Sequence, residues 1–479
     1  MSRTSSLRKN AALNTVKQIC TIIYPMITFP YVSRVLGTYY YGKISFSNSI
    51  VSYILMIAAL GITNYSIREG TRVRNDHEKL QKFCNQIFSI NICSTIVAYA
   101  VLFLLILFWP KLDGYTILLL IQSVTVVFTT IGTDWINSIY EDYEYITIRY
   151  IICQGVAVLL MFLLVKSKED YLFYAFTSSF GTVLANIMNV GYIRKHYDLH
   201  PRFTIHMDVK RNLEPILLLF GSSIATTIYV NSDVTILGIL KDENEVGLYS
   251  ASSKFYSMVK QMLNASLTVA IPRISSERAR YGIETVNSHL NHILSNLIIF
   301  SFPAAAGLFG ISKELILLFC GAEFEPAYTS LEILSVSLIF ATMGCFFVNV
   351  VMISFGMEKN VLLSTFSSAI LNISLNFVLI PQWGQNAAAL TTLMSEILVV
   401  VMGFLFTRHT VNIRIGKMFA CALLEFIAVV IICRLIHMLG LGTLLTIILC
   451  VVLSLLACAA IIAVFDKEKI KEILKRKKS

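Results

Sequence analysis

Apolar stretches of about 20 residues recur along this chain, and they limit its possible folds more than any other feature. A helix needs about 20 mostly apolar residues to cross a hydrocarbon core of about 30 Å. We count about fourteen such stretches, joined by short polar loops. Their approximate bounds are 11–36, 43–66, 83–109, 115–138, 146–166, 171–194, 213–240, 246–271, 288–310, 326–356, 360–381, 386–407, 416–438 and 441–465. The pattern predicts an all-α integral membrane protein with about fourteen transmembrane helices.

The overall composition agrees with a membrane protein rather than a soluble one. Only 14% of the 479 residues are charged, whereas a soluble domain carries about 25%. The first apolar stretch follows Arg3, Arg8 and Lys9, but it is too long for the core of a signal peptide, so we expect a retained span. No soluble segment is large enough to hold an enzyme active site. We therefore predict that the protein is not an enzyme.

Basic residues gather on alternate sides of the predicted spans. With the N-terminus placed in the cytoplasm, the inner segments hold about 28 lysines and arginines and the outer segments about eight. Cytoplasmic loops carry such an excess, so we expect both termini in the cytoplasm. The net charge of +10 then belongs to surfaces that attract anionic headgroups, above all the tail 466–479. Membrane lipids are the expected partners, and nucleic acid is excluded because no folded basic domain is present.

Two hairpins share a short pattern that divides the chain. Residues 32–45 and 234–250 each place an aliphatic pair before a glycine, with a second glycine at the start of the next helix. An even number of spans separates them, which is typical of a parallel repeat about an axis along the membrane normal. We predict a six-helix lobe over 1–200, a second six-helix lobe over 201–410, two additional transmembrane helices over 411–465 and a basic cytoplasmic tail over 466–479.

Two features that could indicate a phosphate-binding loop or a metal site do not meet the requirements of either. Residues Gly37–Lys43 match the G-x-x-x-x-G-K spacing of phosphate-binding loops, but Ile44 stands where a magnesium-binding Ser or Thr is needed. A tight turn between helices explains the two glycines. The ten cysteines form no C-x-x-C pair and no cluster with histidine at metal spacing. We predict no cofactor, no metal site and no catalytic residue, while proton or sodium coupling stays open.

Ionisable side chains inside the predicted spans are the main candidates for function. Each is costly in lipid and by default faces a bundle interior or a cavity. The candidates are Lys17, Lys254 and Lys260 among the bases, and Asp134, Asp233 and Glu396 among the acids. We expect the lysines to line a substrate cavity and the carboxylates to take part in ion coupling or ion pairing.

A structural alternative stays open for several of these positions. Asp233 and Lys254 lie at similar depth on the two arms of one hairpin and can form an ion pair. Lys17 can extend its amine to the inner membrane surface, and Glu396 can bond a neighbouring helix. Lys260 has no obvious partner in the sequence, which favours a cavity position. For Glu425 and Arg434, which lie outside the repeat, a structural role is favoured.

Several short motifs occur along the chain. Their residues are Asn14, Lys17, Pro25, Ser33–Gly37 with Tyr41 and Gly42, Leu60 and Gly61, Arg68 and Glu69, and Val246–Ala251 with Pro272 and Arg273. These motifs resemble those of Wzx-like flippases, which belong to the multidrug/oligosaccharidyl-lipid/polysaccharide exporter superfamily. The resemblance extends over essentially the whole chain, including its length, span count and two lobes.

The resemblance implies a cargo and a mechanism. Wzx-like flippases move undecaprenyl-pyrophosphate-linked oligosaccharide repeat units of O-antigen or capsule from the cytoplasmic to the periplasmic leaflet of the bacterial inner membrane. They act by alternating access around a cationic cavity, for which Lys17, Arg34, Lys254 and Lys260 are the candidates here. A pyrophosphate carries about two negative charges, and cavity cations would offset the cost of burying them. A polysaccharide polymerase is a further possible partner.

Three alternatives remain at this level. The first is an ion-coupled multidrug exporter of the same superfamily, and the second is a lipid II flippase of peptidoglycan synthesis. The third is a membrane-embedded glycan polymerase or ligase, which the lack of long outer loops and of any D-x-D pair disfavours.

Overall fold

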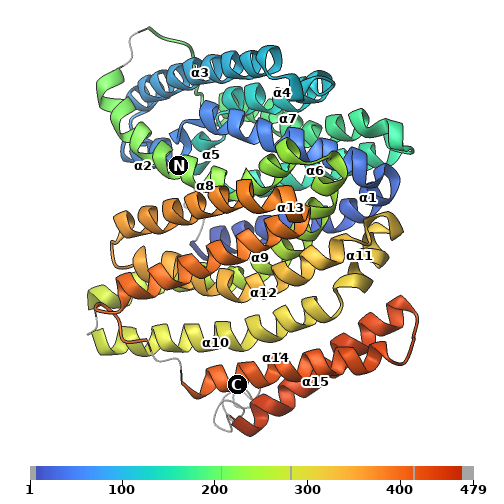
Figure 1. Cartoon of the computed structure of the whole chain (residues 1–479). Helices are drawn as coiled ribbons and strands as arrows, with labels where there is room; N and C mark the ends of the chain where they lie inside the picture. The colour runs from blue at the N-terminus through green and yellow to red at the C-terminus, as the bar shows by residue number, and fades with distance from the viewer. Residues whose placement is uncertain (1–6, 206–207, 281–282, 414–415, 466–479) are drawn as a thin grey trace. The chain divides into compact units, whose positions relative to one another are not determined.

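The structure is a computed structural model that describes residues 7–205, 208–280, 283–413 and 416–465. Within these ranges the chain is built of helices and short turns, with no strand (Figure 1), so the predicted all-α class is confirmed. The elements are α1 (Leu7–Ala59), α2 (Ile62–Val73), α3 (His77–Phe108), η1 (Pro110–Leu112), α4 (Thr116–Gly132), α5 (Trp135–Ile139), α6 (Tyr143–Leu164), η2 (Lys168–Asp170), α7 (Tyr171–His196), α8 (Val209–Leu240), α9 (Glu243–Arg280), α10 (Ile283–Gly310), α11 (Ser312–Cys320), η3 (Ala322–Phe324), α12 (Ala327–Cys345), η4 (Phe346–Met352), α13 (Glu358–Thr407), α14 (Lys417–His437) and α15 (Thr443–Phe465).

Two of the long helices are interrupted at a glycine. Gly37 (φ 70°, ψ 178°) breaks α1, and Gly384 (φ 52°, ψ −130°) breaks α13. Both backbone conformations lie where a side chain is strongly disfavoured, so glycine is the residue that permits them. The breaks fall between the predicted stretches 11–36 and 43–66, and between 360–381 and 386–407. Each of these helices therefore contributes two helical segments.

Nine helices within the described residues are long and apolar enough to cross a membrane, and Thr116–Gly132 is a shorter apolar helix. This agrees with a protein that passes the membrane many times. The total of fourteen spans and the cytoplasmic position of both termini stay predictions.

The chain separates into two compact units, Met1–Ile239 and Leu240–Ser479. In the first unit, α1 packs against α3, α4 and α6, and α7 packs against α4 and α6. A buried cluster joins α2, α3, α5 and α7 through residues such as Leu80, Trp135 and Ile193. The predicted boundaries at 200, 410 and 465 stay predictions, and the tail 466–479 lies outside the described residues.

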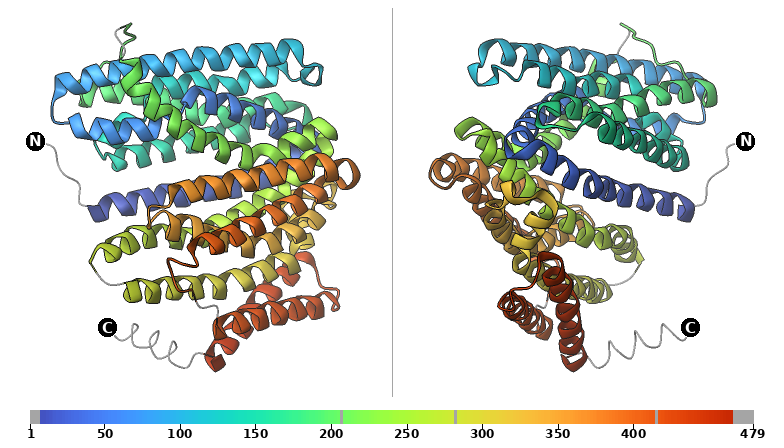
Figure 2. Two further views of the ribbon diagram at one scale, coloured as in Figure 1. Left: turned by 60° about the vertical axis from the view of Figure 1, so that its left-hand side comes forward. Right: turned by 90° about the vertical axis from the view of Figure 1, so that its right-hand side faces the viewer.

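In the second unit, α12 packs against α9, α10 and α13, while α10 also packs against α14 and α15. The two views of Figure 2 show α14 and α15 running beside α10. A small apolar core fills this contact, with Ala306 from α10, Val429 and Cys433 from α14, and Cys450 and Cys458 from α15.

Candidate functional site

A buried ion pair joins α9 and α13 in the second unit. The Lys260 amine donates a 2.6 Å hydrogen bond to Glu396 Oε1, and the Tyr256 hydroxyl donates to the same oxygen at 3.3 Å. The Glu396 side chain is 5% exposed and that of Lys260 is 24% exposed. The Lys260 nitrogen also lies 5.5 Å from the centroid of the Tyr256 ring. The sequence assigned Lys260 to the substrate cavity and Glu396 to ion coupling, and the structure brings the two together.

The backbone around this pair is irregular. Directly after α12, residues Phe346–Met352 form the π-helical turn η4, which packs against α9 and α13. Such turns occur frequently at functional sites. Asn264, one turn beyond Lys260, donates to the sulfur of Cys345 at 3.2 Å, while its Oδ1 is buried without a hydrogen-bond partner among the described residues. Polar groups on α9 therefore continue along the helix from Lys260.

A large apolar cavity lies on another side of α9. It has a volume of about 940 Å³, and side chains of α9, α10 and α15 make up most of its wall. Val259, Met262 and Leu263 of α9 line it, together with Phe300 of α10 and Leu455 of α15. Sequence reasoning missed this cavity. The available signal was the helical spacing of Val259 and Met262, which places their side chains on a different side of the helix from Lys260.

A second, polar cavity of about 660 Å³ lies elsewhere in the same unit, at the C-terminal ends of α10 and α14. Lys313, Glu314, Glu332, Arg434 and His437 line it. His437 Nε2 lies 3.2 Å from Glu314 Oε1. Arg434, for which the sequence favoured a structural role, is thus part of a polar wall.

In the first unit, Asp134 forms an ion pair with Arg149 of α6. Asn137 also donates to Asp134 Oδ1, at 3.3 Å, and to Asn189 Oδ1, at 2.6 Å. The Asn189 amide in turn donates to the backbone oxygen of Gly132 at 2.6 Å. The Arg149 side chain is only 6% exposed, whereas that of Asp134 is 43% exposed. Arg149 is one of the basic residues counted in the inner segments of the predicted topology, and that count gives no sign that its side chain is buried.

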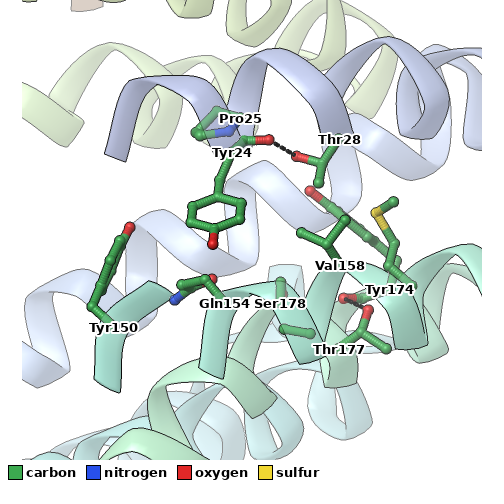
Figure 3. A pocket seen from close by; sticks show the side chains of 11 residues that line it. Tyr24, Pro25, Thr28, Tyr150, Gln154, Val158, Tyr174, Thr177 and Ser178 are labelled. Atoms are coloured by element: carbon green, nitrogen blue, oxygen red, sulfur yellow. Dashed lines mark hydrogen bonds between the residues drawn. The ribbon is translucent and has the colours of Figure 1, made fainter. Parts of the chain in front are cut away.

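A small pocket of about 150 Å³ lies between α1, α6 and α7 of the first unit. Hydroxyl and amide groups line much of it, from Tyr24, Thr28, Gln154, Tyr174 and Ser178 (Figure 3). Tyr150 also lines the pocket, and the Lys17 amine lies 5.9 Å from the centroid of its ring. The structure thus places Lys17 beside a pocket whose lining is uncharged and mixes polar groups with apolar side chains such as Val158 and Met161.

Three further candidates lie at other positions on the helices. Arg34 is exposed on α1, Asp233 is buried on α8, and Lys254 is partly buried on α9. Asp233 and Lys254 belong to different units, so the ion pair between them stays a prediction. Among the described residues, no group of three or more His, Cys, Asp or Glu side chains is placed to hold a metal ion.

The sequence matches two family models over more than half of its length each. The model described as polysaccharide biosynthesis protein matches residues 7–278, and the model described as lipid II flippase MurJ matches residues 145–465. A candidate O-antigen transporter of Escherichia coli (strain K12) is 22% identical over 414 residues, which cover 84% of this chain and 97% of the relative. A candidate low-salt glycan biosynthesis flippase of Haloferax volcanii is 24% identical over 174 residues, which cover 36% of this chain and 37% of the relative.

Solved structures share the fold. The lipid II flippase MurJ in an inward closed conformation superposes with a TM-score of 0.76 at 17% identity, covering 96% of this chain and 99% of that one. An inward-facing multidrug transporter of the MATE family superposes with a TM-score of 0.59 at 14% identity, covering 81% and 97%. At these identities the likeness shows the fold alone.

Proposed function

This chain belongs to the polysaccharide biosynthesis protein family, and from that membership we propose that it is a flippase for lipid-linked oligosaccharides. It would move undecaprenyl-pyrophosphate-linked repeat units of O-antigen or capsule from the cytoplasmic to the periplasmic leaflet of the bacterial inner membrane. It is a transporter and not an enzyme, in line with the names of its relatives. The transport would proceed by alternating access, with a polysaccharide polymerase as the partner that uses the exported units.

The two-sided character of α9 is the observation that carries this proposal. One side of the helix holds Lys260 in its bond to Glu396, and Val259 and Met262 line a cavity of about 940 Å³. A lipid-linked oligosaccharide likewise combines a charged part and an apolar part, because an anionic diphosphate joins its sugar to a long apolar chain. The cavity would accept apolar chain, and Lys260 would offset the charge of the diphosphate.

Exchange of partners at Lys260 would link transport to an ion. When the diphosphate binds the Lys260 amine, Glu396 loses its counter-charge in a site where its side chain is 5% exposed. A carboxylate in that position is costly unless it gains a proton or a sodium ion. Lys17, Arg34 and Lys254 would add positive charge to the cargo path, and Asp134 and Asp233 remain further candidates for ion coupling.

The membrane potential would favour export without ATP. About two negative charges that move outward through an inside-negative potential of about 100 mV gain roughly 5 kcal/mol.

For the membrane topology we propose fourteen spans with both termini in the cytoplasm. Separating α1 at Gly37 and α13 at Gly384 supplies two spans from each, and α3, α4, α6, α7, α8, α9, α10, α12, α14 and α15 supply the others.

A lipid II flippase is the second candidate, because the MurJ model matches residues 145–465. Both candidates handle a diphosphate-linked glycan, and they differ in the glycan that accumulates when the protein is lost.

Deletion of the gene in its native host distinguishes the candidates. We expect surface polysaccharide to disappear while its lipid-linked repeat units build up in the inner leaflet, as measured by mass spectrometry of extracted lipids. Accumulation of lipid II with intact surface polysaccharide would favour the second candidate. Unchanged glycans with increased drug sensitivity would reject both in favour of a multidrug exporter.

A further inference from the structure

Glu425 is a buried carboxyl group that the proposed transport cycle does not use. It lies near the middle of α14, and its relative exposure is 0%. Neither of its carboxyl oxygens has a hydrogen-bond partner among the residues that the structure describes. Glu396, the buried acid of α13, differs in this respect, because Lys260 and Tyr256 both donate to it.

The helices packed against α14 present no opposite charge at this level. The packing helices are α10 and α15. The ring of Phe302 on α10 lies 6.5 Å from that of Phe426, the neighbour of Glu425 in sequence, which places this part of α10 at the level of Glu425 along α14. On α10 the nearest ionisable residue in sequence to Phe302 is His292, about 15 Å away along the helix axis at 1.5 Å per residue.

The titratable neighbours of Glu425 are thiols. The ionisable residues of α15 are cysteines only, Cys450 and Cys458. The Cys458 thiol interacts electrostatically with the Glu425 carboxyl and with the Cys421 thiol, across the contact between α14 and α15. Ala422 and Val429, on either side of Glu425 along α14, are fully buried.

A charged carboxylate cannot persist in such surroundings. The transfer of an isolated ionised carboxylate into an apolar interior costs so much that the group neutralises instead. Because neither α10 nor α15 presents a cation at this level within the part of the chain that the structure describes, Glu425 becomes neutral by binding a proton. We propose that Glu425 is a proton-binding site within the contact of α10, α14 and α15, separate from the Lys260–Glu396 pair.

The presence of a proton on Glu425 determines whether the wall of the apolar cavity is closed or open. Cys458 and Cys433 line the cavity, and both lie on the helices that enclose Glu425. Loss of the proton leaves a charge that needs water, and water can reach it only if α14 or α15 moves away from α10. The cavity wall is therefore closed when Glu425 is protonated and open when it is ionised, whatever cargo the protein carries.

Infrared spectroscopy of the purified protein in lipid bilayers tests the protonation directly. A difference spectrum between the wild type and E425Q at neutral pH is expected to contain the carbonyl stretch of a protonated carboxylic acid, although free glutamate is ionised at that pH. E425D is the second variant, and its spectrum should keep the band at a shifted position, so the test does not depend on E425Q alone. A difference spectrum that contains only carboxylate bands would overturn the proposal.

Thiol labelling tests the link to the cavity wall. Cys458 is labelled with a maleimide at neutral and alkaline pH in wild type and E425Q, and the modified peptide is quantified by mass spectrometry. The thiolate fraction rises in both proteins, and an ionised Glu425 beside Cys458 disfavours the thiolate in the wild type, so faster labelling in the wild type than in E425Q reports opening of the wall. The ratio of the wild-type rate to the E425Q rate should rise with pH as the carboxyl ionises, by at most about tenfold per pH unit, and level off once ionisation is complete. A ratio that stays constant would show that Glu425 does not control the wall.

Discussion

At the scale of single residues, burial of the ion pair between Lys260 and Glu396 imposes a desolvation cost on the second unit. A buried ion pair recovers its desolvation cost only with good geometry and additional hydrogen bonds. Here the amine lies 2.6 Å from the carboxylate and Tyr256 supplies a second donor. Removal of one partner would leave the other charge buried without compensation, which is far worse than removal of both. The pair is therefore a sensitive point for both stability and transport.

Lys260→Met should abolish most export and lower the free energy of unfolding by about 3 kcal/mol, because Glu396 is then buried as an unpaired acid. The double variant K260M/E396L should recover stability without recovering export, since the diphosphate of the cargo then lacks its cationic partner. Surface polysaccharide in a complemented deletion strain measures export, and unfolding in detergent measures stability. Lys359→Met, at an exposed lysine, is the matched control. Normal export by the double variant would contradict a role for the pair in cargo binding.

At the scale of elements, the glycine breaks in α1 and α13 decide where one long helix becomes two. At Gly384 the turn is held by a side chain from another helix, because the amide of Gln385 donates to Glu245 Oε2 of α9 at 2.7 Å. An acid at the start of a helical segment satisfies a free amide and complements the helix dipole. A Cβ atom at position 384 would lie 2.2 Å from that same oxygen.

Gly384→Ala should therefore destabilise the second unit by about 1–3 kcal/mol, the usual cost of a side chain in a glycine-only conformation. The Glu245 carboxylate would also have to leave the Gln385 amide. The midpoint of thermal inactivation in detergent should fall, and the measurement is made at one heating rate because membrane proteins often unfold irreversibly. Gly191→Ala on α7, where an added Cβ meets open space, is the control. Equal midpoints for the two variants would show that the break tolerates a side chain.

At the scale of the whole molecule, orientation in the membrane depends on charge rather than on packing. The basic residues of the loops and of the tail 466–479 lie in segments that the predicted topology places on one side. Positive charge is retained on the cytoplasmic side during insertion, and this bias sets the direction of the first and following spans.

Reporter fusions test the direction. Green fluorescent protein fused after residue 479 should fluoresce, and alkaline phosphatase fused at the same point should be inactive, because both report a cytoplasmic C-terminus. A fusion of alkaline phosphatase in the loop between α14 and α15 should be active and serves as the control for the opposite side. An active phosphatase at the C-terminus would require an odd number of spans or the reverse orientation.

Much of the fold follows from the sequence because the hydrophobic effect and the polarity of the backbone act locally along the chain. Apolar stretches of span length predicted helices, and the breaks at Gly37 and Gly384 coincide with boundaries between predicted stretches. The same stretches identified Lys260, Asp134 and Glu396 as unusual, because an ionisable residue within a span can be recognised without knowledge of its neighbours.

The sequence by itself determined the helical class, the family and the set of costly residues, since each depends on composition and order alone. The tertiary structure decided which of those residues meet. Lys260 and Glu396 are 136 positions apart, and their contact depends on the rotation of two helices about their axes, which hydropathy does not specify. The apolar cavity beside α9, the burial of Arg149 and the isolation of Glu425 arise in the same way. Each depends on how neighbouring helices pack against one another, so it does not follow from the sequence of any single helix.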